Sequence, residues 1–433
     1  MIIRQNNIIE EHKKLPVLGS FNPDVRSAKY TDGLLLNDRA PLYDQKYFFI
    51  WNKDQKPEPC YTAHYIIGAQ RIGDEELIIE PKMKDIDFMK MFSVCLSSNL
   101  SSDTFAQIYD IDLDAKPIKT TTSISASLTP LLIVHFLILM KRITSKGLRS
   151  DYLERNENLK KVKGKIDIKN NESKNVICKR FDRVYCSYSE RSVNIPENRL
   201  FKKTLLICKR YINRMVKHEL YPELYTRINA CLSVFEGVDE NIELQEIRNT
   251  KRNNLYKDYG DAVKLALKIL KSMECSITDV NTDSQYTPVF WIDMALLYEH
   301  YVLGLLKKAY GSDIKYQLPG KYGWKPDYLH VGEKLIMDAK YMPQLGDSSA
   351  TGDIVRQLSG YSRIESYTNA LGVDKETVVP CVILYPILSE GIEKVCFDTK
   401  RTLLEQATPL TQLIKFYKLG VPMPKLGNQS HGR

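Results

Sequence analysis

Short apolar and alternating runs, separated by turn residues, dominate the first part of the chain. Residues 47–51, 63–67 and 76–79 have the length and composition of β-strands, with Gly, Asp and Pro between them. The segment YIIGAQRIGDEELIIEPKM predicts a β-hairpin with its turn at Gly73 and Asp74. These patterns predict a β-rich N-terminal domain, residues 1–120.

The middle of the chain mixes helical and strand patterns. Residues 126–150 have helical periodicity, with Pro130 near the start and Gly147 placed to end the helix. The most apolar run in this helix, residues 131–140, is about half the length that crosses a bilayer, so we expect a buried helix and no membrane contact. His135 lies inside that run and is expected to be a core or edge histidine with a partner.

Further along, three short runs predict strands at 163–168, 175–178 and 183–188. A long helix is predicted from Pro196, and more helices follow to about residue 273. The polar stretch SITDVNTDSQYTP then marks a boundary. The sequence therefore predicts an α+β multidomain protein, in which a mixed helical and β middle domain, residues 121–280, is followed by a C-terminal domain, residues 281–433.

Composition and charge narrow the class of protein. A chain of 433 residues with 43% hydrophobic and 27% charged residues is globular rather than disordered, and its length favours two or three domains. The formal net charge is +9, but residues 141–183 alone hold 14 basic and 6 acidic residues, or +8. Such a stretch suits DNA, an acidic protein partner or simply a solvated surface.

The cysteines and histidines give no zinc motif. Nine Cys occur without a CxxC pair, and seven His are dispersed, so free thiols in a reducing, cytoplasmic compartment are the simplest interpretation. The N-terminal segment MIIRQNNIIEEHKK lacks the long apolar stretch of a signal peptide.

Candidate chemistry begins near residue 289. The segment VFWIDMALLYEHYVLGLLKKAYG is predicted to be a helix with Ile292, Ala295, Val302 and Leu306 on one apolar stripe. Glu299 falls in the middle of that stripe. A carboxylate there is expected either to be half-buried with a partner or to lie at the edge of the stripe.

The next segment, KYGWKPDYLHVGEKLIMDAKYMPQ, predicts a second hairpin. Strands 324–331 and 334–341 would be joined by a two-residue type II′ turn at Gly332 and Glu333. Paired residue numbers then sum to 665, which places Asp327 opposite Asp338. Lys340 follows two residues later on the same face, so two carboxylates and one ammonium group are predicted to lie together.

Two neighbouring carboxylates repel each other, and a divalent cation relieves that repulsion. Mg²⁺ is commonly held by one or two carboxylates, with water and phosphate oxygens completing its coordination. Lys340 could then hold the attacking water or stabilise charge on the phosphate. The alternative is a surface hairpin with an ordinary Asp–Lys ion pair. The following helix, DIVRQLSGYSRI, adds Gln357 and Tyr361 on one face.

In this order, the Glu, PD, DAK and QxxxY residues resemble the PD-(D/E)xK nuclease superfamily, with Asp in place of Glu before the Lys. The resemblance implies an α/β nuclease core, a mixed sheet flanked by helices, in the C-terminal domain. It implies that Asp327 and Asp338 bind Mg²⁺, or Mn²⁺, and that Lys340 orients or activates water. Glu299 would assist the metal or the water, and Gln357 and Tyr361 would support the site or contact double-stranded DNA.

ITSKGLRSDYLERNENLKKVKGKIDI and CSYSERSVNIPENRLFKKTL resemble the McrC family, the nuclease subunits of modified-cytosine-dependent restriction systems. The usual L-R-G-R is V-K-G-K here, and the C-Y-D-E-like string lacks its Asp. The resemblance implies a separate AAA+ GTPase of the McrB type that reads and translocates DNA, with the N-terminal and middle domains used for docking. This chain has no GxxxxGK[ST] string, so it is expected to bind no nucleotide by a P-loop.

Two other functions stay open at this point. One is a stand-alone DNA-repair or RNA-processing nuclease with the same core, which would cut without a partner or GTP. The other is a non-catalytic stimulator of an AAA+ ring, in which the Asp and Lys cluster is degenerate.

Overall fold

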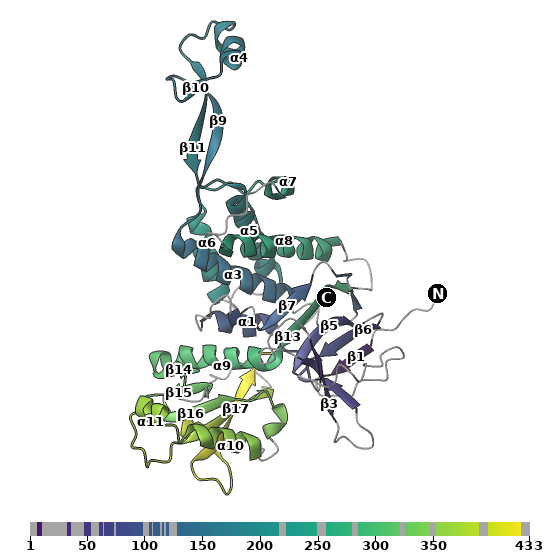
Figure 1. Ribbon diagram of the computed structural model, residues 1–433, viewed down its shortest axis with the longest axis vertical. Helices are drawn as coiled ribbons and strands as arrows, with labels where there is room; N and C mark the ends of the chain where they lie inside the picture. The colour runs from purple at the N-terminus through teal and green to yellow at the C-terminus, as the bar shows by residue number, and fades with distance from the viewer. Residues whose placement is uncertain are drawn as a thin grey trace, which may run out of the picture. The chain divides into compact units, whose positions relative to one another are not determined.

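The computed structural model shows a mixed α/β protein with several sheets (Figure 1). It divides into two compact units, Met1–His135 with Ser276–Arg433, and Phe136–Cys275. The three predicted domains stay a prediction. Before residue 65 the structure describes only residues 7–10, 33–35, 47–52 and 60–63. After residue 65 it describes everything except residues 73–74, 98–103, 106, 113–114, 117, 121–127, 216–221, 249–256, 279–284, 321–324, 347–351, 389–396 and 426–433.

The N-terminal part of the first unit is β-rich, as predicted. The hairpin of β5 (Ile66–Ile72) and β6 (Glu75–Glu80) is confirmed, while its turn lies outside the described residues. Its strands belong to a five-stranded sheet with the order β1-β6-β5-β13-β7. The other strands of that sheet are β1 (Asn7–Glu10), β7 (Tyr109–Asp112) and β13 (Val289–Asp293). One smaller sheet contains β2 (Gly33–Leu35), β3 (Tyr47–Asn52) and β4 (Cys60–Ala63). Another contains β8 (Ile118–Thr120) and β12 (Gln285–Thr287).

Strand β13 corrects one prediction. Residues 289–293 pair with both β5 and β7, so Ile292 belongs to a strand and not to the helical stripe. The helix α9 (Met294–Tyr310) begins only after Asp293, whose side chain accepts a hydrogen bond from the backbone N–H of Leu296 (3.0 Å). An Asp at this N-cap position, preceded by a β-branched and aromatic run, is the sequence signal for such a boundary.

The C-terminal part of the first unit is built on a six-stranded mixed sheet with the order β14-β15-β16-β17-β19-β18. Helix α9 covers one side, and α10 (Gly352–Tyr361) and α11 (Glu365–Leu371) cover the other (Figure 1). Helix α1 (Phe88–Ser97) packs on α9. The strands are β14 (Ile314–Tyr316), β15 (Tyr328–His330), β16 (Leu335–Ala339), β17 (Cys381–Leu388), β18 (Thr408–Pro409) and β19 (Phe416–Met423), with the short helix α12 (Leu403–Gln406) before β18.

The predicted apolar helix is α3 (Leu128–Lys146), and Gly147, with φ +86°, ends it in the left-handed conformation. Among the described helices, α3 is long and apolar enough to cross a membrane, but 67% of its most apolar window is buried inside the protein. A core helix gives the same result, in agreement with the predicted burial. The ring of His135 is hydrogen-bonded to the hydroxyl of Tyr109, so it has the expected partner.

The second unit contains a two-stranded arm on a helical body (Figure 1). Strand β9 (Asp151–Leu159), which the sequence did not indicate, pairs antiparallel with β11 (Val184–Ser192). Near its end the arm contains β10 (Lys165–Ile166), the helix α4 (Ile168–Asn171) and a π-helical turn (Glu172–Val176). The body contains the predicted helices: α5 (Pro196–Met215), α6 (Pro222–Val234), α7 (Leu244–Arg248) and α8 (Lys257–Thr278).

The strands predicted at 163–168 and 175–178 are largely wrong. The side chain of Asp167 accepts a hydrogen bond from the backbone N–H of Asn170 and so begins a helix where the strand was expected to continue. Asn175 is buried, and its amide exchanges hydrogen bonds with the amide of Asn158 (2.7 and 2.9 Å). These local bonds compete with strand pairing and fold the end of the arm into a compact turn.

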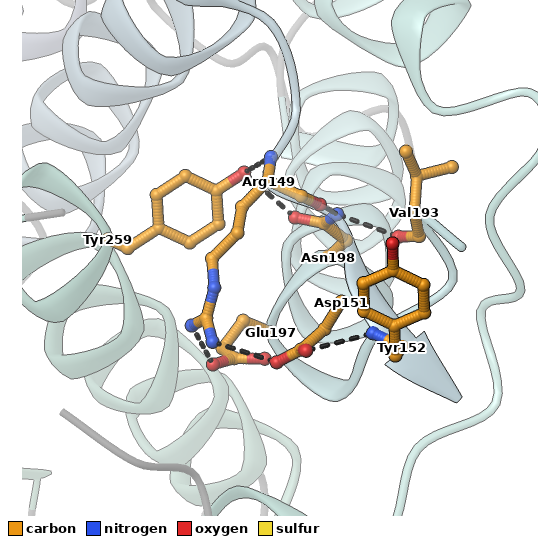
Figure 2. A network of polar contacts seen from close by, with 7 residues as sticks. All are labelled: Arg149, Asp151, Tyr152, Val193, Glu197, Asn198 and Tyr259. Atoms are coloured by element: carbon orange, nitrogen blue, oxygen red, sulfur yellow. Dashed lines mark hydrogen bonds and ion pairs between the residues drawn. The ribbon is translucent and has the colours of Figure 1, made fainter. Parts of the chain in front are cut away.

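A buried polar network joins the base of the arm to the helical body (Figure 2). The side chain of Asn198 is fully buried and donates to the backbone carbonyls of Arg149 (2.9 Å) and Val193 (2.7 Å). The hydroxyl of Tyr259 donates to Oδ1 of Asn198 and accepts from the backbone N–H of Arg149. The guanidinium of Arg149 pairs with the buried carboxylate of Glu197 (2.9 Å). These contacts fix the ends of both arm strands.

We expect Asn198→Ala to lower the free energy of unfolding by about 2–4 kcal/mol, because it leaves two carbonyls and one hydroxyl without their buried partner. Urea denaturation of the full chain would measure the loss. Asn241→Ala is the matched control, since Asn241 is exposed and its change should stay within about 0.5 kcal/mol. Equal stability of the two variants would contradict this assignment.

Candidate active site

The predicted hairpin has the predicted register. Tyr328 pairs with Met337, Leu329 with Ile336, and His330 with Leu335, so every pair sums to 665. The predicted two-residue type II′ turn is wrong. The loop has four residues, Lys334 is the one with positive φ (+58°), and a Cβ on Gly332 would lie 2.8 Å from Asp313. The backbone N–H of Val331 donates to the carbonyl of Asp313 instead of closing a tighter turn.

Asp327 and Asp338 lie at the open end of this hairpin. Oδ2 of Asp327 accepts a hydrogen bond from the backbone N–H of Ala339 (2.8 Å). Asp338 is 1% exposed, and its Oδ2 lies 2.6 Å from Nζ of Lys340 in an ion pair that is not aligned as a hydrogen bond. Burial raises the pKa of both carboxyls, and the charge of Asp338 raises that of Asp327 further. The two acids are therefore close enough to repel each other.

Lys340, Gln357 and Tyr361 form a chain of side-chain contacts that begins at Asp338. Burial lowers the pKa of Lys340, but the ion pair with Asp338 outweighs it and the pKa is raised, so the ammonium stays charged. Nζ of Lys340 donates to Oε1 of Gln357 (3.1 Å), and Nε2 of Gln357 donates to the hydroxyl of Tyr361 (2.8 Å). One face of α10 thus supports the ammonium group.

Glu299 is half-buried with partners, which is one of the two arrangements that the sequence left open. Its Oε1 accepts hydrogen bonds from the hydroxyl of Tyr316 and from Nε2 of Gln317, both 2.9 Å. Its backbone carbonyl accepts from the hydroxyl of Tyr328 (2.6 Å). Burial raises the pKa of Glu299, the two side-chain bonds lower it, and the charge of Asp338 raises it again.

The three carboxylates share one property: the protein holds one oxygen of each. Oε2 of Glu299, Oδ1 of Asp327 and Oδ1 of Asp338 accept no hydrogen bond from the residues that the structure describes. No set of three or more His, Cys, Asp or Glu within those residues is arranged to hold a metal ion. Mg²⁺ needs only one or two carboxylates, and the buried, mutually repelling Asp pair fits that requirement.

Three contacting residues were missed by the sequence reasoning. Tyr316 and Gln317 hold Glu299, but no tight turn links β14 to β15, so their register could not be counted. Lys82 lies 259 residues before Tyr341 in sequence and donates from Nζ to its backbone carbonyl (3.3 Å), directly after Lys340. No local pattern in the sequence indicates such a contact.

The family model described as McrBC 5-methylcytosine restriction system component matches residues 62–385, about three quarters of the chain. This chain belongs to that family. The match includes all six predicted site residues and the whole arm of the second unit. The resemblance stated from the sequence is therefore confirmed at the level of the family, as a component of an McrBC restriction system.

Solved structures with related chains come from Thermococcus gammatolerans. One is a refined half-complex from the tetradecameric assembly of McrB AAA+ hexamers with bound McrC, with 14% identity over 98% of this chain and 95% of that chain, and a TM-score of 0.36. Another is the McrBC complex, with 14% identity over 70% of this chain and 88% of that chain, and a TM-score of 0.30. No curated protein matches the chain.

Proposed function

We propose that this McrBC component is the Mg²⁺-dependent endonuclease subunit that cuts double-stranded DNA. The observation that carries the proposal is the buried pair Asp327 and Asp338 beside Lys340, reached from opposite sides of the sheet by Glu299 and by Gln357. Two like charges kept in a dry site are costly unless a cation joins them. Family membership supports a role in restriction.

Asp327 and Asp338 would hold the metal, each through its Oδ1, because Oδ2 of Asp327 accepts the Ala339 N–H and Oδ2 of Asp338 faces the Lys340 ammonium. A bound Mg²⁺ supplies positive charge to a phosphoryl oxygen and lowers the pKa of a water molecule. Lys340 stays protonated beside Asp338 and stabilises negative charge that develops on the phosphate. Gln357 fixes the direction of the Lys340 ammonium, and Glu299 offers its second oxygen to orient water.

The proposed partner is an AAA+ GTPase of the McrB type, such as the McrB hexamers that bind McrC in the Thermococcus gammatolerans assembly. The end of the arm, residues 160–183, supports a protein contact. Ile168 is 75% exposed, Ile177 73% and Phe181 76%, among basic side chains. Exposed large apolar residues gathered on an ordered element are typical of interaction surfaces. We propose that this arm end docks on the partner, in the cytoplasm.

The raised pKa values of Asp327 and Asp338 make the stability of the metal-free protein depend on pH. A carboxyl whose pKa is raised by folding binds more protons when folded than when unfolded, so the free energy of unfolding falls as pH rises above about 4. We expect Asp327→Asn to remove part of this fall in metal-free protein. Saturating Mg²⁺ should stabilise the wild type at pH 8 by about 1–3 kcal/mol and leave Asp327→Asn unchanged. Denaturant titrations at pH 5 and pH 8 would show both effects, and equal Mg²⁺ stabilisation of the two proteins would contradict the site.

A cleavage assay on methylated and unmethylated DNA, with and without the AAA+ GTPase and GTP, tests the proposed function as a whole. We expect cutting of methylated DNA only in the complete mixture. Cutting without partner or GTP would instead indicate a stand-alone nuclease. Stimulated GTP hydrolysis without any cutting would indicate a non-catalytic adaptor.

A further inference from the structure

Gln317 occupies an unusual place at the edge of the site. It follows the last residue of β14, and its backbone N–H donates to the carbonyl of Asp327 (3.0 Å). Its side chain donates from Nε2 to Oε1 of Glu299 (2.9 Å). One residue therefore bonds to the backbone of one predicted catalytic acid and to the side chain of another.

The backbone of Gln317 is left-handed, with φ +43°. Successive side chains of a regular strand point to opposite faces of the sheet. Tyr316 and Gln317 are consecutive, yet both donate to the same oxygen of Glu299. The left-handed turn breaks the alternation and brings the amide of Gln317 to the side where the Tyr316 hydroxyl already lies. Such a conformation is unfavourable for a residue other than Gly, Asn or Asp and persists where the surroundings require it.

We infer that Gln317 is a positioning residue: its left-handed backbone and its amide, together with Tyr316, fix Oε1 of Glu299 so that Oε2 stays open toward Asp327 and Asp338. The inference rests on the proposed nuclease function and deepens it. With both donors on one oxygen, rotation of the carboxylate is blocked, and Glu299 presents a single oxygen to the reaction. Neighbours that orient a catalytic group in this way change activity by about 10–100-fold when they are removed.

Gln317→Gly separates positioning from support of the fold. Glycine accepts the left-handed backbone without strain but lacks the amide. We expect kcat for DNA cleavage in the complete complex to fall about tenfold, KM for DNA to stay within about twofold, and the melting temperature not to fall. Lys334→Gly is the matched control. Lys334 also has positive φ (+58°), but its Nζ contacts the surface carbonyl of Gly372, so kcat should not change.

A double-mutant cycle identifies the group through which Gln317 acts. In a Glu299→Gln background, Gln317→Gly should lower kcat by less than about twofold, because the carboxylate that Gln317 positions is gone. Tyr316→Phe removes the other donor, and Tyr316→Phe with Gln317→Gly should reach the kcat of Glu299→Gln. Agreement of both results supports the inference.

Two kinds of failure are distinguishable. If the wild type cuts, Asp338→Asn does not, and Gln317→Gly keeps wild-type kcat, the inference is wrong while the nuclease function stands. A full tenfold loss in the Glu299→Gln background would also overturn it, since Gln317 would then act elsewhere. If Asp338→Asn cuts like the wild type, the proposed active site is wrong, and the inference fails with it.

Discussion

Asp338→Asn is expected to abolish DNA cleavage, with a loss of at least about a thousandfold in the complex of this chain with its AAA+ partner. Asn keeps the size of the side chain but removes the charge that would bind the metal and that pairs with Lys340. Charge stabilisation by a metal ion contributes several kcal/mol to the transition state, and each 1.36 kcal/mol is a factor of ten in rate. Single-turnover cleavage of methylated DNA at saturating Mg²⁺ would measure the loss.

The control, Asp353→Asn, removes an exposed carboxylate charge from the same part of the chain. Asp353 also lies in the C-terminal part, on α10, where its carboxylate is exposed and pairs with Arg356 at the surface. Asp353→Asn should cut at the wild-type rate. Both variants should still bind the partner and stimulate its GTP hydrolysis. Wild-type cleavage by Asp338→Asn would show that the proposed metal site is wrong.

The second large effect is expected at the end of the arm. Ile177→Ser with Phe181→Ser should weaken binding of the AAA+ partner about a hundredfold, because exposed apolar anchors contribute most of the binding energy of an interface and 1.4 kcal/mol is a factor of ten. Partner-dependent cleavage should then need correspondingly more partner. The stability of the chain should change by no more than about 0.5 kcal/mol, since both side chains are more than 70% exposed. A binding titration followed by cleavage at each partner concentration would test this.

Ile414→Ser provides the matched control for that surface. Ile414 is 81% exposed in the first unit, far along the chain from the arm. It should bind the partner with wild-type affinity. If Ile414→Ser weakens binding as much as the arm variant does, exposed apolar residues contribute generally and the arm has no special role.

The hairpin of β15 and β16 shows how much of the site could be predicted. Antiparallel pairing keeps the sum of paired residue numbers constant, so a four-residue loop closed by His330 and Leu335 gives the same register as a two-residue turn closed by Val331 and Lys334. The juxtaposition of Asp327 and Asp338 was therefore predicted correctly although the turn type was wrong. The Gln357–Tyr361 contact followed from helical spacing in the same way.

Other elements gave no usable signal. Strand β9 is exposed or half-exposed along its whole length, so it has no apolar alternation to detect. Strand β14 and Lys82 meet the site through contacts that no nearby turn fixes in register. Strand β13 was different, because its β-branched and aromatic composition and the cap at Asp293 were present in the sequence. The predicted helix started at residue 289, several residues before α9 begins at Met294. Local rules thus predicted local neighbours, and long-range pairing supplied the rest.

Asp293 ends β13 and caps α9 at once, which leaves no slack between the N-terminal sheet and the helix that holds Glu299. At the usual rise per residue, Glu299 lies only about 9 Å along that helix from the sheet. A force that moves β13 along its axis is therefore transmitted to the carboxylate of Glu299 through the first turns of α9. We therefore expect a displacement of the N-terminal sheet to move Glu299 of the proposed site, although most strands of that sheet lie far from Glu299 in the sequence.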